Sequence, residues 1–205
     1  RRRQSKCPTE SAKPVVLVGT GIETDRLFTS VMTDHGKLGK SLADAVIQGK
    51  AVKVGILSGN QSQLGMRQRL KSVKDKLEEA GIEISWILSE KELDKKMRNV
   101  EYFAEQPVDT VISLDNDDTE KAVDIILNDD RISWKLYGDG RSEKLIYYLD
   151  KGTIQELAVP NEYYMGYQSI ALAAQNIRYY TDKTEQAEVE FYMVSKDNLY
   201  DEETS

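Results

Sequence analysis

Two glycine-containing segments have residue types that can hold a phosphate group. Gly36-Lys37-Leu38-Gly39-Lys40-Ser41 ends like a nucleotide-binding loop, but such a loop needs a glycine five residues before its Gly-Lys pair, where Asp34 stands. We interpret this segment as the start of a helix with Ser41 in its first turn. Gly19-Thr20-Gly21 has two glycines of a dinucleotide fingerprint, but Thr24 replaces the third and no helix of suitable length follows. Neither segment predicts a nucleotide site.

The run Asp115-Asn116-Asp117-Asp118 contains residue types that bind metal ions. A calcium-binding loop would also need a glycine and a bidentate glutamate at fixed spacing, and neither is in place. The run follows an apolar segment and precedes a helical one, so we expect its carboxylates to cap a helix N-terminus. The amide of Asn116 remains a candidate for contact with a ligand.

Residues of the common catalytic and metal sites are scarce. No Gly-x-Ser-x-Gly motif occurs, and Cys7 and His35 are the only residues of their types. An internal disulfide, a His-Cys zinc cluster and a multi-histidine metal site are therefore excluded. We predict no catalytic residue, no metal ligand and no cofactor, although an enzyme on this kind of fold, using Asp34 or His35, stays an alternative.

Tyrosine is unusually frequent, with 11 Tyr against 3 Phe. Partly exposed tyrosines suit a ligand cleft or a partner surface, because the ring is apolar and the hydroxyl forms hydrogen bonds. The alternative is a core rim that faces water. The tyrosines concerned cluster in the last third of the chain: Tyr147, Tyr148, Tyr163, Tyr164 and Tyr167.

Short apolar segments alternate with longer amphipathic ones along the whole chain. We predict extended segments at 14–18, 28–32, 52–57, 82–88, 109–114, 132–137, 153–159 and 188–194. We predict helices at 40–48, 63–80, 90–104, 118–128, 142–150 and 163–180. This alternation indicates an α/β fold with a parallel, doubly wound sheet.

Ligands of such sheets bind beyond the carboxyl ends of the strands. The turns in that position are 19–22, 34–36, 59–61, 115–117, 138–141 and 160–162. They contain the polar candidates Asp34, His35, Asn60, Asn116 and Asp139.

Composition narrows the class of partner. The chain has 205 residues with 28 Lys+Arg against 35 Asp+Glu, a net charge of −7, so it is poorly suited to bind nucleic acids or anionic membranes. No apolar run approaches the ~20 residues of a membrane span, and no apolar segment of a signal peptide follows Arg1 to Lys6. We expect no nucleic acid partner for these residues.

Six short motifs occur in an order that is similar to one known family. They are Val31-Met32-Thr33-Asp34-His35-Gly36, the strand that ends at Gly59, Arg69-Leu70-Lys71-Ser72-Val73, Leu114 to Asp118, Tyr137 to Gly140, and Leu149 to Ile154 with Met165-Gly166. From about Pro14 to Leu199 the chain resembles the type I periplasmic sugar-binding proteins, whose fold also forms the effector-binding core of lactose-repressor-type regulators.

The resemblance implies a periplasmic-binding-protein type I fold of two lobes, with the ligand in the cleft between them. Residues 1–32 would end the first lobe and 33–162 would form the second. Residues 163–187 would return to the first lobe, and 188–205 would supply the last strand of the second lobe and a tail. Most of the chain would then be the second lobe.

The resemblance also implies ligand contacts. Arg69 matches an arginine, and Asn116 an asparagine, that bind sugar hydroxyls. His35 stands where asparagine is usual after Asp34, and Asp139 lies one place before the position of the cleft aspartate, which is Gly140 here. Pro160 replaces a frequent glutamine. Asp34, His35, Asn60 and Asp139 complete the expected binding set.

The expected function is therefore non-enzymatic binding of a small polar ligand, a sugar or sugar-like molecule, for ABC uptake or signalling. An ABC permease or a membrane sensor kinase would be the protein partner, and the location would be the periplasm or the cell surface. The alternative is the effector-binding core of a cytoplasmic lactose-repressor-type regulator.

Overall fold

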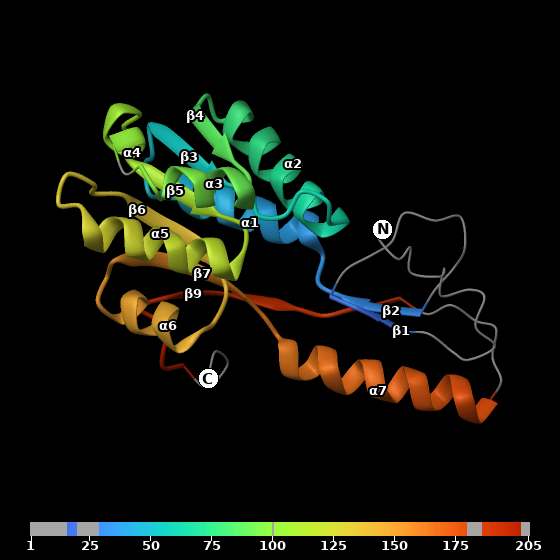
Figure 1. The fold of residues 1–205 in the computed structure, drawn as a ribbon. Helices are drawn as coiled ribbons and strands as arrows, with labels where there is room; N and C mark the ends of the chain where they lie inside the picture. The colour runs from blue at the N-terminus through green and yellow to red at the C-terminus, as the bar shows by residue number, and fades with distance from the viewer. Residues whose placement is uncertain (1–15, 20–28, 100, 180–185, 202–205) are drawn as a thin grey trace. The chain divides into compact units, whose positions relative to one another are not determined.

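The computed structural model describes residues 16–19, 29–99, 101–179 and 186–201, which belong to two compact units of one chain (Figure 1). Unit 1 comprises Arg1–Asp34 and Asn161–Glu190, and unit 2 comprises His35–Pro160 and Phe191–Ser205. The chain passes from one unit to the other three times. Cys7, Thr20, Gly21 and Thr24 lie outside the described residues.

Unit 2 is built on a six-stranded sheet with the order β4-β3-β5-β6-β7-β9. Its first five strands are mutually parallel, and β9 pairs with β7 in the antiparallel sense. The α/β class with a parallel sheet is thereby confirmed. The strands are β3 (Lys53–Leu57), β4 (Glu83–Leu88), β5 (Thr110–Ser113), β6 (Lys135–Asp139), β7 (Ile154–Pro160) and β9 (Phe191–Ser195).

Helices cover both faces of this sheet because side chains on the buried strands alternate between two apolar cores. On β5, Val111 points into one core and Ile112 into the other. The first core lies under α3 (Glu90–Lys96), α4 (Glu101–Glu105), α5 (Asn116–Asn128) and α6 (Glu143–Asp150). The second lies under α1 (His35–Gln48) and α2 (Leu64–Glu79).

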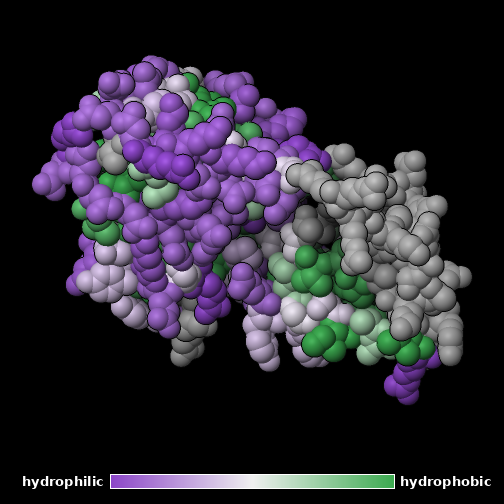
Figure 2. Space-filling model, in the orientation of Figure 1, coloured by the Kyte–Doolittle hydropathy of each residue, from purple (hydrophilic) through white to green (hydrophobic). Residues whose placement is uncertain are grey.

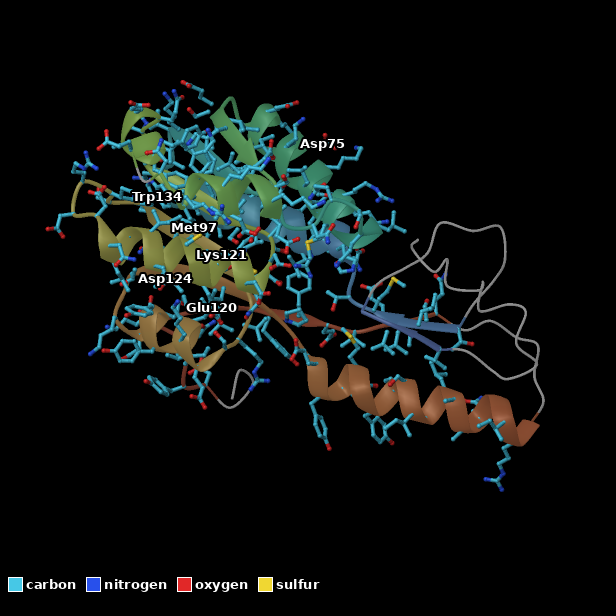
Figure 3. The ribbon with its side chains drawn as sticks, viewed as in Figure 1. Asp75, Met97, Glu120, Lys121, Asp124 and Trp134 are labelled. Carbon is cyan, nitrogen blue, oxygen red and sulfur yellow. The ribbon has the colours of Figure 1, made fainter. Side chains whose placement is uncertain are left out.

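An aromatic cluster fills the first core. The ring centroids of Trp86 and Phe103 lie 5.9 Å apart, and those of Phe103 and Trp134 lie 5.3 Å apart; Trp134 is labelled in Figure 3. Gly55 on β3 lies against the Trp86 ring, where an added Cβ would stand 2.2 Å from Cζ2. The absence of a side chain at this position therefore makes room for the indole.

Unit 1 contains a parallel three-stranded sheet in the order β1-β2-β8, with β1 (Val16–Val18), β2 (Thr29–Met32) and β8 (Gln186–Glu188). Helix α7 (Glu162–Tyr179) packs on this sheet through a small core of Val31, Leu172 and Val189. Figure 2 shows apolar residues at the surface of this unit, and Ile170 and Ile177 of α7 are largely exposed. None of the helices in the described ranges has the length and apolar character that crossing a membrane requires.

Four predicted elements differ from the observed ones. Helix α1 begins five residues before the predicted start at residue 40, so Ser41 does not lie in its first turn. The predicted helix 90–104 is divided into α3 and α4 by a turn that lets both Leu93 and Phe103 reach the core. Residues 132–134 precede strand β6, and the predicted strand 188–194 is two strands, β8 and β9, in different units.

We predict that Gly55→Ala lowers the unfolding free energy of unit 2 by about 1–3 kcal/mol, because the new methyl group would overpack the Trp86 ring against its neighbours. Urea denaturation followed by the fluorescence of Trp86 and Trp134, the two tryptophans of the chain, measures this change. Gly166→Ala in α7 is the control, because its Cβ would meet no atom within 4 Å. An equal effect of the two substitutions would contradict the packing argument.

Candidate functional site

The carboxyl ends of β3, β5, β6 and β7 meet at one edge of the unit 2 sheet, because these strands are parallel. Asn60 follows β3, Asn116 follows β5, and Asp139 is the last residue of β6. Arg69 of α2 reaches the same edge, as its contacts with Leu114 after β5 and with Asp139 at the end of β6 show, and His35 of α1 contacts Arg69. This edge is the candidate site.

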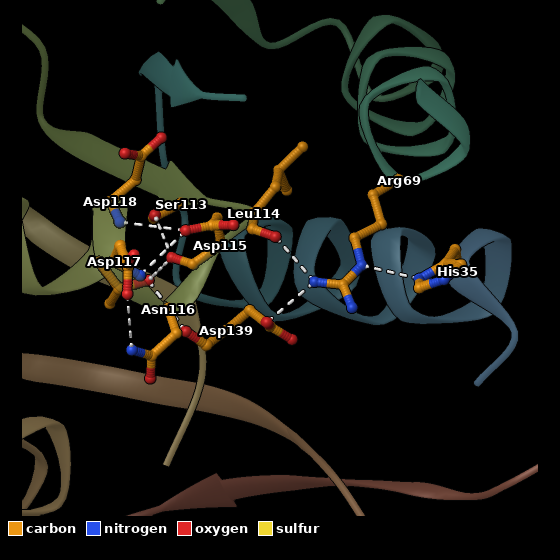
Figure 4. A network of polar contacts seen from close by, with 10 residues as sticks. His35, Arg69, Ser113, Leu114, Asp115, Asn116, Asp117, Asp118 and Asp139 are labelled. Carbon is orange, nitrogen blue, oxygen red and sulfur yellow. Dashed lines mark hydrogen bonds and ion pairs between the residues drawn. The ribbon is translucent and has the colours of Figure 1, made fainter. Parts of the chain in front are cut away.

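Arg69 lies at the centre of a buried polar network (Figure 4), with 4% of its surface exposed. Its Nη1 lies 2.9 Å from Oδ1 of Asp139 and donates a 2.7 Å hydrogen bond to the carbonyl oxygen of Leu114. Its Nε donates to Nδ1 of His35 over 3.0 Å. A guanidinium stays protonated in proteins, so these acceptors compensate a permanent buried charge.

The contact with Arg69 fixes the protonation state of His35. Since Nδ1 accepts a hydrogen bond from Nε of Arg69, the ring is neutral and carries its proton on Nε2. The imidazole is buried, with 6% exposure, and it packs against Gly65, where an added Cβ would stand 2.4 Å from Nε2. His35 is therefore a positioned neutral acceptor.

Two glycines allow α1 and α2 to approach closely enough for this contact. An added Cβ on Gly39 of α1 would lie 2.6 Å from the backbone oxygen of Arg69, and Gly65 of α2 accommodates the His35 ring. The glycine pattern of residues 36–41 thus serves helix packing, because the whole segment lies inside α1. A phosphate-binding loop is not formed here.

The N-terminus of α5 borders the same edge. Asp115 caps this helix, as its Oδ1 accepts hydrogen bonds from the backbone N–H groups of Asp117 at 2.9 Å and Asp118 at 3.4 Å. Asn116 is half-buried beside Gly140, where φ is +128° and an added Cβ would stand 2.2 Å from Oδ1 of Asn116. Gly140 therefore leaves room for the Asn116 amide next to Asp139.

The remaining sequence candidates occupy different surroundings. Asn60 is exposed in the turn after β3, where its Oδ1 accepts hydrogen bonds from the backbone N–H and hydroxyl of Ser62. Asp34 belongs to unit 1, at the chain crossing directly before His35. Of the tyrosines, Tyr147 and Tyr148 lie in α6, and Tyr163, Tyr164 and Tyr167 lie in α7 of unit 1. The structure thus brings Arg69, His35 and Asp139 into contact and places Asn116 beside them.

Two groups of this site were missed by sequence reasoning. The carbonyl oxygen of Leu114 is an acceptor for Arg69. The hydroxyl of Thr119 lies 2.7 Å from the carbonyl oxygen of Asp115 and 3.0 Å from that of Asp139, so its one proton is shared between α5 and the end of β6. A backbone acceptor carries no signal in the sequence. Thr119 could have been noticed as a polar residue on the buried side of the predicted helix.

Asp118 is a buried carboxyl group in the first turn of α5. Burial raises the pKa of Asp118 to about 6, the Lys121 ammonium opposes this shift, and the Asp115 and Glu90 carboxylates add to it. Oδ1 of Asp118 lies 3.3 Å from Nζ of Lys121, which also pairs with Asp94 at 2.8 Å; Lys121 is labelled in Figure 3. Oδ2 of Asp118 has no hydrogen-bond partner among the described residues.

Comparison with known proteins identifies the family of this chain. Residues 10–180 match the family model described as periplasmic binding protein domain, and the chain belongs to this family. A carbohydrate transporter solute-binding protein from Agrobacterium radiobacter, solved with D-arabinose, superposes with a TM-score of 0.82 and 17% identity over 93% of this chain and 69% of that one. The resemblance noted in the sequence is thereby confirmed at the level of the family.

Two further structures show the range of proteins with this fold. The glucose-galactose binding protein GanP from Geobacillus stearothermophilus is similar, with a TM-score of 0.79 and 22% identity over 91% of this chain and 69% of that one. A putative LacI transcriptional regulator from Bacteroides fragilis has a TM-score of 0.76 and 15% identity over 91% and 68%. A search of curated proteins found no match.

We predict that Arg69→Met lowers the unfolding free energy of unit 2 by about 3–5 kcal/mol, because it leaves the Asp139 carboxylate buried without its cationic partner. Adding Asp139→Leu to this variant should recover part of the loss. Urea denaturation measures both changes. Lys71→Met is the control, since the Lys71–Asp75 pair is exposed to solvent and should contribute little to stability.

We predict that Asp118→Asn stabilises unit 2 in a pH-dependent way. A carboxyl whose pKa is raised on folding destabilises the fold increasingly as pH rises from its ordinary value through about 6. The variant should therefore gain about 2–3 kcal/mol at pH 7.5 and lose this advantage near pH 4. Denaturation curves across this range test the prediction, with exposed Asp117→Asn as control. A gain independent of pH would contradict it.

Proposed function

We propose that this chain binds a small, neutral, polyhydroxylated ligand, a carbohydrate, at the edge of unit 2 that carries Arg69, Asp139 and Asn116. It binds the ligand without transforming it. Membership of the periplasmic binding protein family supports a binding role, and two of the similar structures are a solute-binding protein in complex with D-arabinose and a glucose-galactose binding protein, whose ligands are neutral sugars.

The hydrogen-bonding capacity of Arg69 is the observation that carries this proposal. Its Nε and Nη1 are engaged by His35, Leu114 and Asp139, whereas no described residue accepts a hydrogen bond from Nη2 (Figure 4). Nη2 therefore keeps two N–H donors for a ligand, in an orientation that the three neighbours fix. Because the guanidinium group is already held in place by its neighbours, it loses little conformational entropy when it binds a hydroxyl group of the ligand.

The charge balance favours a neutral ligand over an anionic one. The Asp139 carboxylate compensates the Arg69 charge, and His35 is neutral because its Nδ1 is an acceptor. A phosphate or carboxylate ligand would meet no uncompensated cation in this network, and it would lie near Asp115 and Asp117 at the start of α5. Hydroxyl groups can both accept from Arg69 and donate to a carboxylate or amide oxygen.

The location and the partner belong to the same proposal. We place the protein outside the cytoplasm, where it would present its ligand to an ABC permease or to a membrane sensor kinase. Residues 1–32 and 163–187 would belong to the first lobe, and 33–162 and 188–205 to the second. The similarity to a LacI-type regulator extends to the fold and does not favour DNA regulation.

We predict that isothermal titration with D-arabinose, D-galactose, D-glucose and myo-inositol detects binding of at least one sugar or polyol. Asn116→Ala should weaken that binding about 10-fold, because one or two hydrogen bonds to the ligand are lost. Its effect on folding should be small, because the Asn116 amide makes only long hydrogen bonds of 3.4 Å to Asp117 and Glu120.

Asn99→Ala is the matched control, because Asn99 is exposed in the turn between α3 and α4. Equal affinity of the Asn116→Ala and Asn99→Ala variants for the ligand would contradict binding at this edge of the sheet. Absence of binding for the entire panel, with a folded protein, would reject the carbohydrate proposal.

A further inference from the structure

A pocket, called the α6 pocket below, lies on the helical layer of unit 2 that contains α6. It has a volume of about 440 Å³, and its apolar part is formed by Ile146 of α6, Val159 of β7, Val194 of β9 and Leu199. These four residues belong to the core under α3 to α6 or pack against it. Helices α1 and α2, which carry His35 and Arg69, cover the other core, to which Leu38, Leu42 and Val73 belong. The pocket shares no residue with the Arg69 network.

The size and lining of this pocket suit a small molecule. Ligand pockets commonly enclose about 300–1,000 Å³ and combine an apolar interior with a few polar groups. Val159, Val194 and Leu199 are otherwise buried, with exposures of 8%, 2% and 8%. An apolar group in the pocket would add van der Waals contacts on the side of these residues that faces the pocket.

Two opposite charges line the pocket, Arg141 and Glu143. Within the described part of the chain, neither of them forms an ion pair or a side-chain hydrogen bond. Charges on neighbouring elements are paired: Lys144 with Asp124 at 2.7 Å and Lys121 with Asp94 at 2.8 Å. The pocket thus offers a cation and an anion that are both available to a ligand.

Two exposed aromatic rings complete the lining. Tyr147 of α6 and Tyr200 are 56% and 78% exposed. Large exposed aromatic side chains supply apolar contact area at low cost in conformational entropy, and their hydroxyl groups can bond to a polar head group. A ligand with an aromatic or branched aliphatic body would contact these rings and the apolar residues together.

We propose that this pocket binds a free hydrophobic α-amino acid. The carboxylate of the ligand pairs with Arg141, its ammonium pairs with Glu143, and its side chain contacts Ile146, Val159, Val194 and Leu199. A simple organic anion would be repelled by Glu143, and a simple amine by Arg141, so the two charges together select a zwitterion. This site is independent of the carbohydrate site.

Isothermal titration of the 205-residue chain with L-phenylalanine and L-leucine tests the proposal. We expect saturable binding of at least one of them below about 1 mM. The ligands 3-phenylpropionate and 2-phenylethylamine, which each lack one charge of phenylalanine, should bind at least 10-fold more weakly. Absence of binding up to that concentration, or equal binding of either single-charge ligand, would overturn the proposal.

Variants locate the site. Arg141→Gln and Glu143→Gln should each weaken amino acid binding at least 10-fold, whereas Arg98→Gln, which removes an exposed charge elsewhere, should not. Asn116→Ala should leave amino acid affinity unchanged, which separates this site from the carbohydrate site. Amide shifts in NMR spectra confined to α6, β9 and residues 199–200 would support the assignment, and shifts centred on α1 and α2 would overturn it.

Discussion

The Arg69 side chain is a permanent positive charge that unit 2 keeps away from water. Its compensation requires acceptors from three separate elements: the His35 ring at the start of α1, the Leu114 carbonyl after β5, and the Asp139 carboxylate at the end of β6. Each acceptor has to lie within hydrogen-bonding distance at the same time. The placement of α1 and α2 relative to the sheet is therefore fixed by electrostatics as well as by apolar packing.

The small residues of α1 and α2 follow from this requirement. Without side chains at Gly39 and Gly65, the backbone oxygen of Arg69 and the His35 ring can both lie at the helix interface. Larger residues would separate the helices and lengthen the Arg69–His35 hydrogen bond. The opposite layer of unit 2 has a different character, since the aromatic rings of Trp86, Phe103 and Trp134 pack in its core.

Much of the fold could be predicted from the sequence, because alternating apolar segments and helical periodicity specify a parallel α/β sheet. Predictions were poorer where tertiary contacts decide the outcome. Because glycine disfavours helices, Gly36 and Gly39 led to a predicted start of α1 at residue 40, after both glycines. In the structure Gly39 lies inside α1, where the lack of a side chain allows close contact with the backbone of Arg69. The run 188–194 contains the last residue of β8 in unit 1 and most of β9 in unit 2, and nothing local in its sequence marks the break.

The candidate site was accessible to the same reasoning only in part. Position after a strand pointed to Asn116, His35 and Asp139, and the family resemblance pointed to Arg69, but the ion pair between residues 69 and 139 depends on how two distant segments pack. Every residue has a backbone carbonyl group, so the sequence cannot single out that of Leu114 as an acceptor. The α6 pocket was also hidden, because its lining comes from α6, β7, β9 and the following turn, which lie far apart along the chain.

The division of the chain between the units has a consequence for biosynthesis. Strand β9 completes the unit 2 sheet beside β7, yet the whole segment Asn161–Glu190, which belongs to unit 1, is translated between these two strands. A nascent chain that has emerged as far as Pro160 therefore exposes β7 as an unpaired edge, which is a template for pairing with other chains. This edge stays open to such pairing until residues 191–195 have been synthesised and β9 can pair with β7.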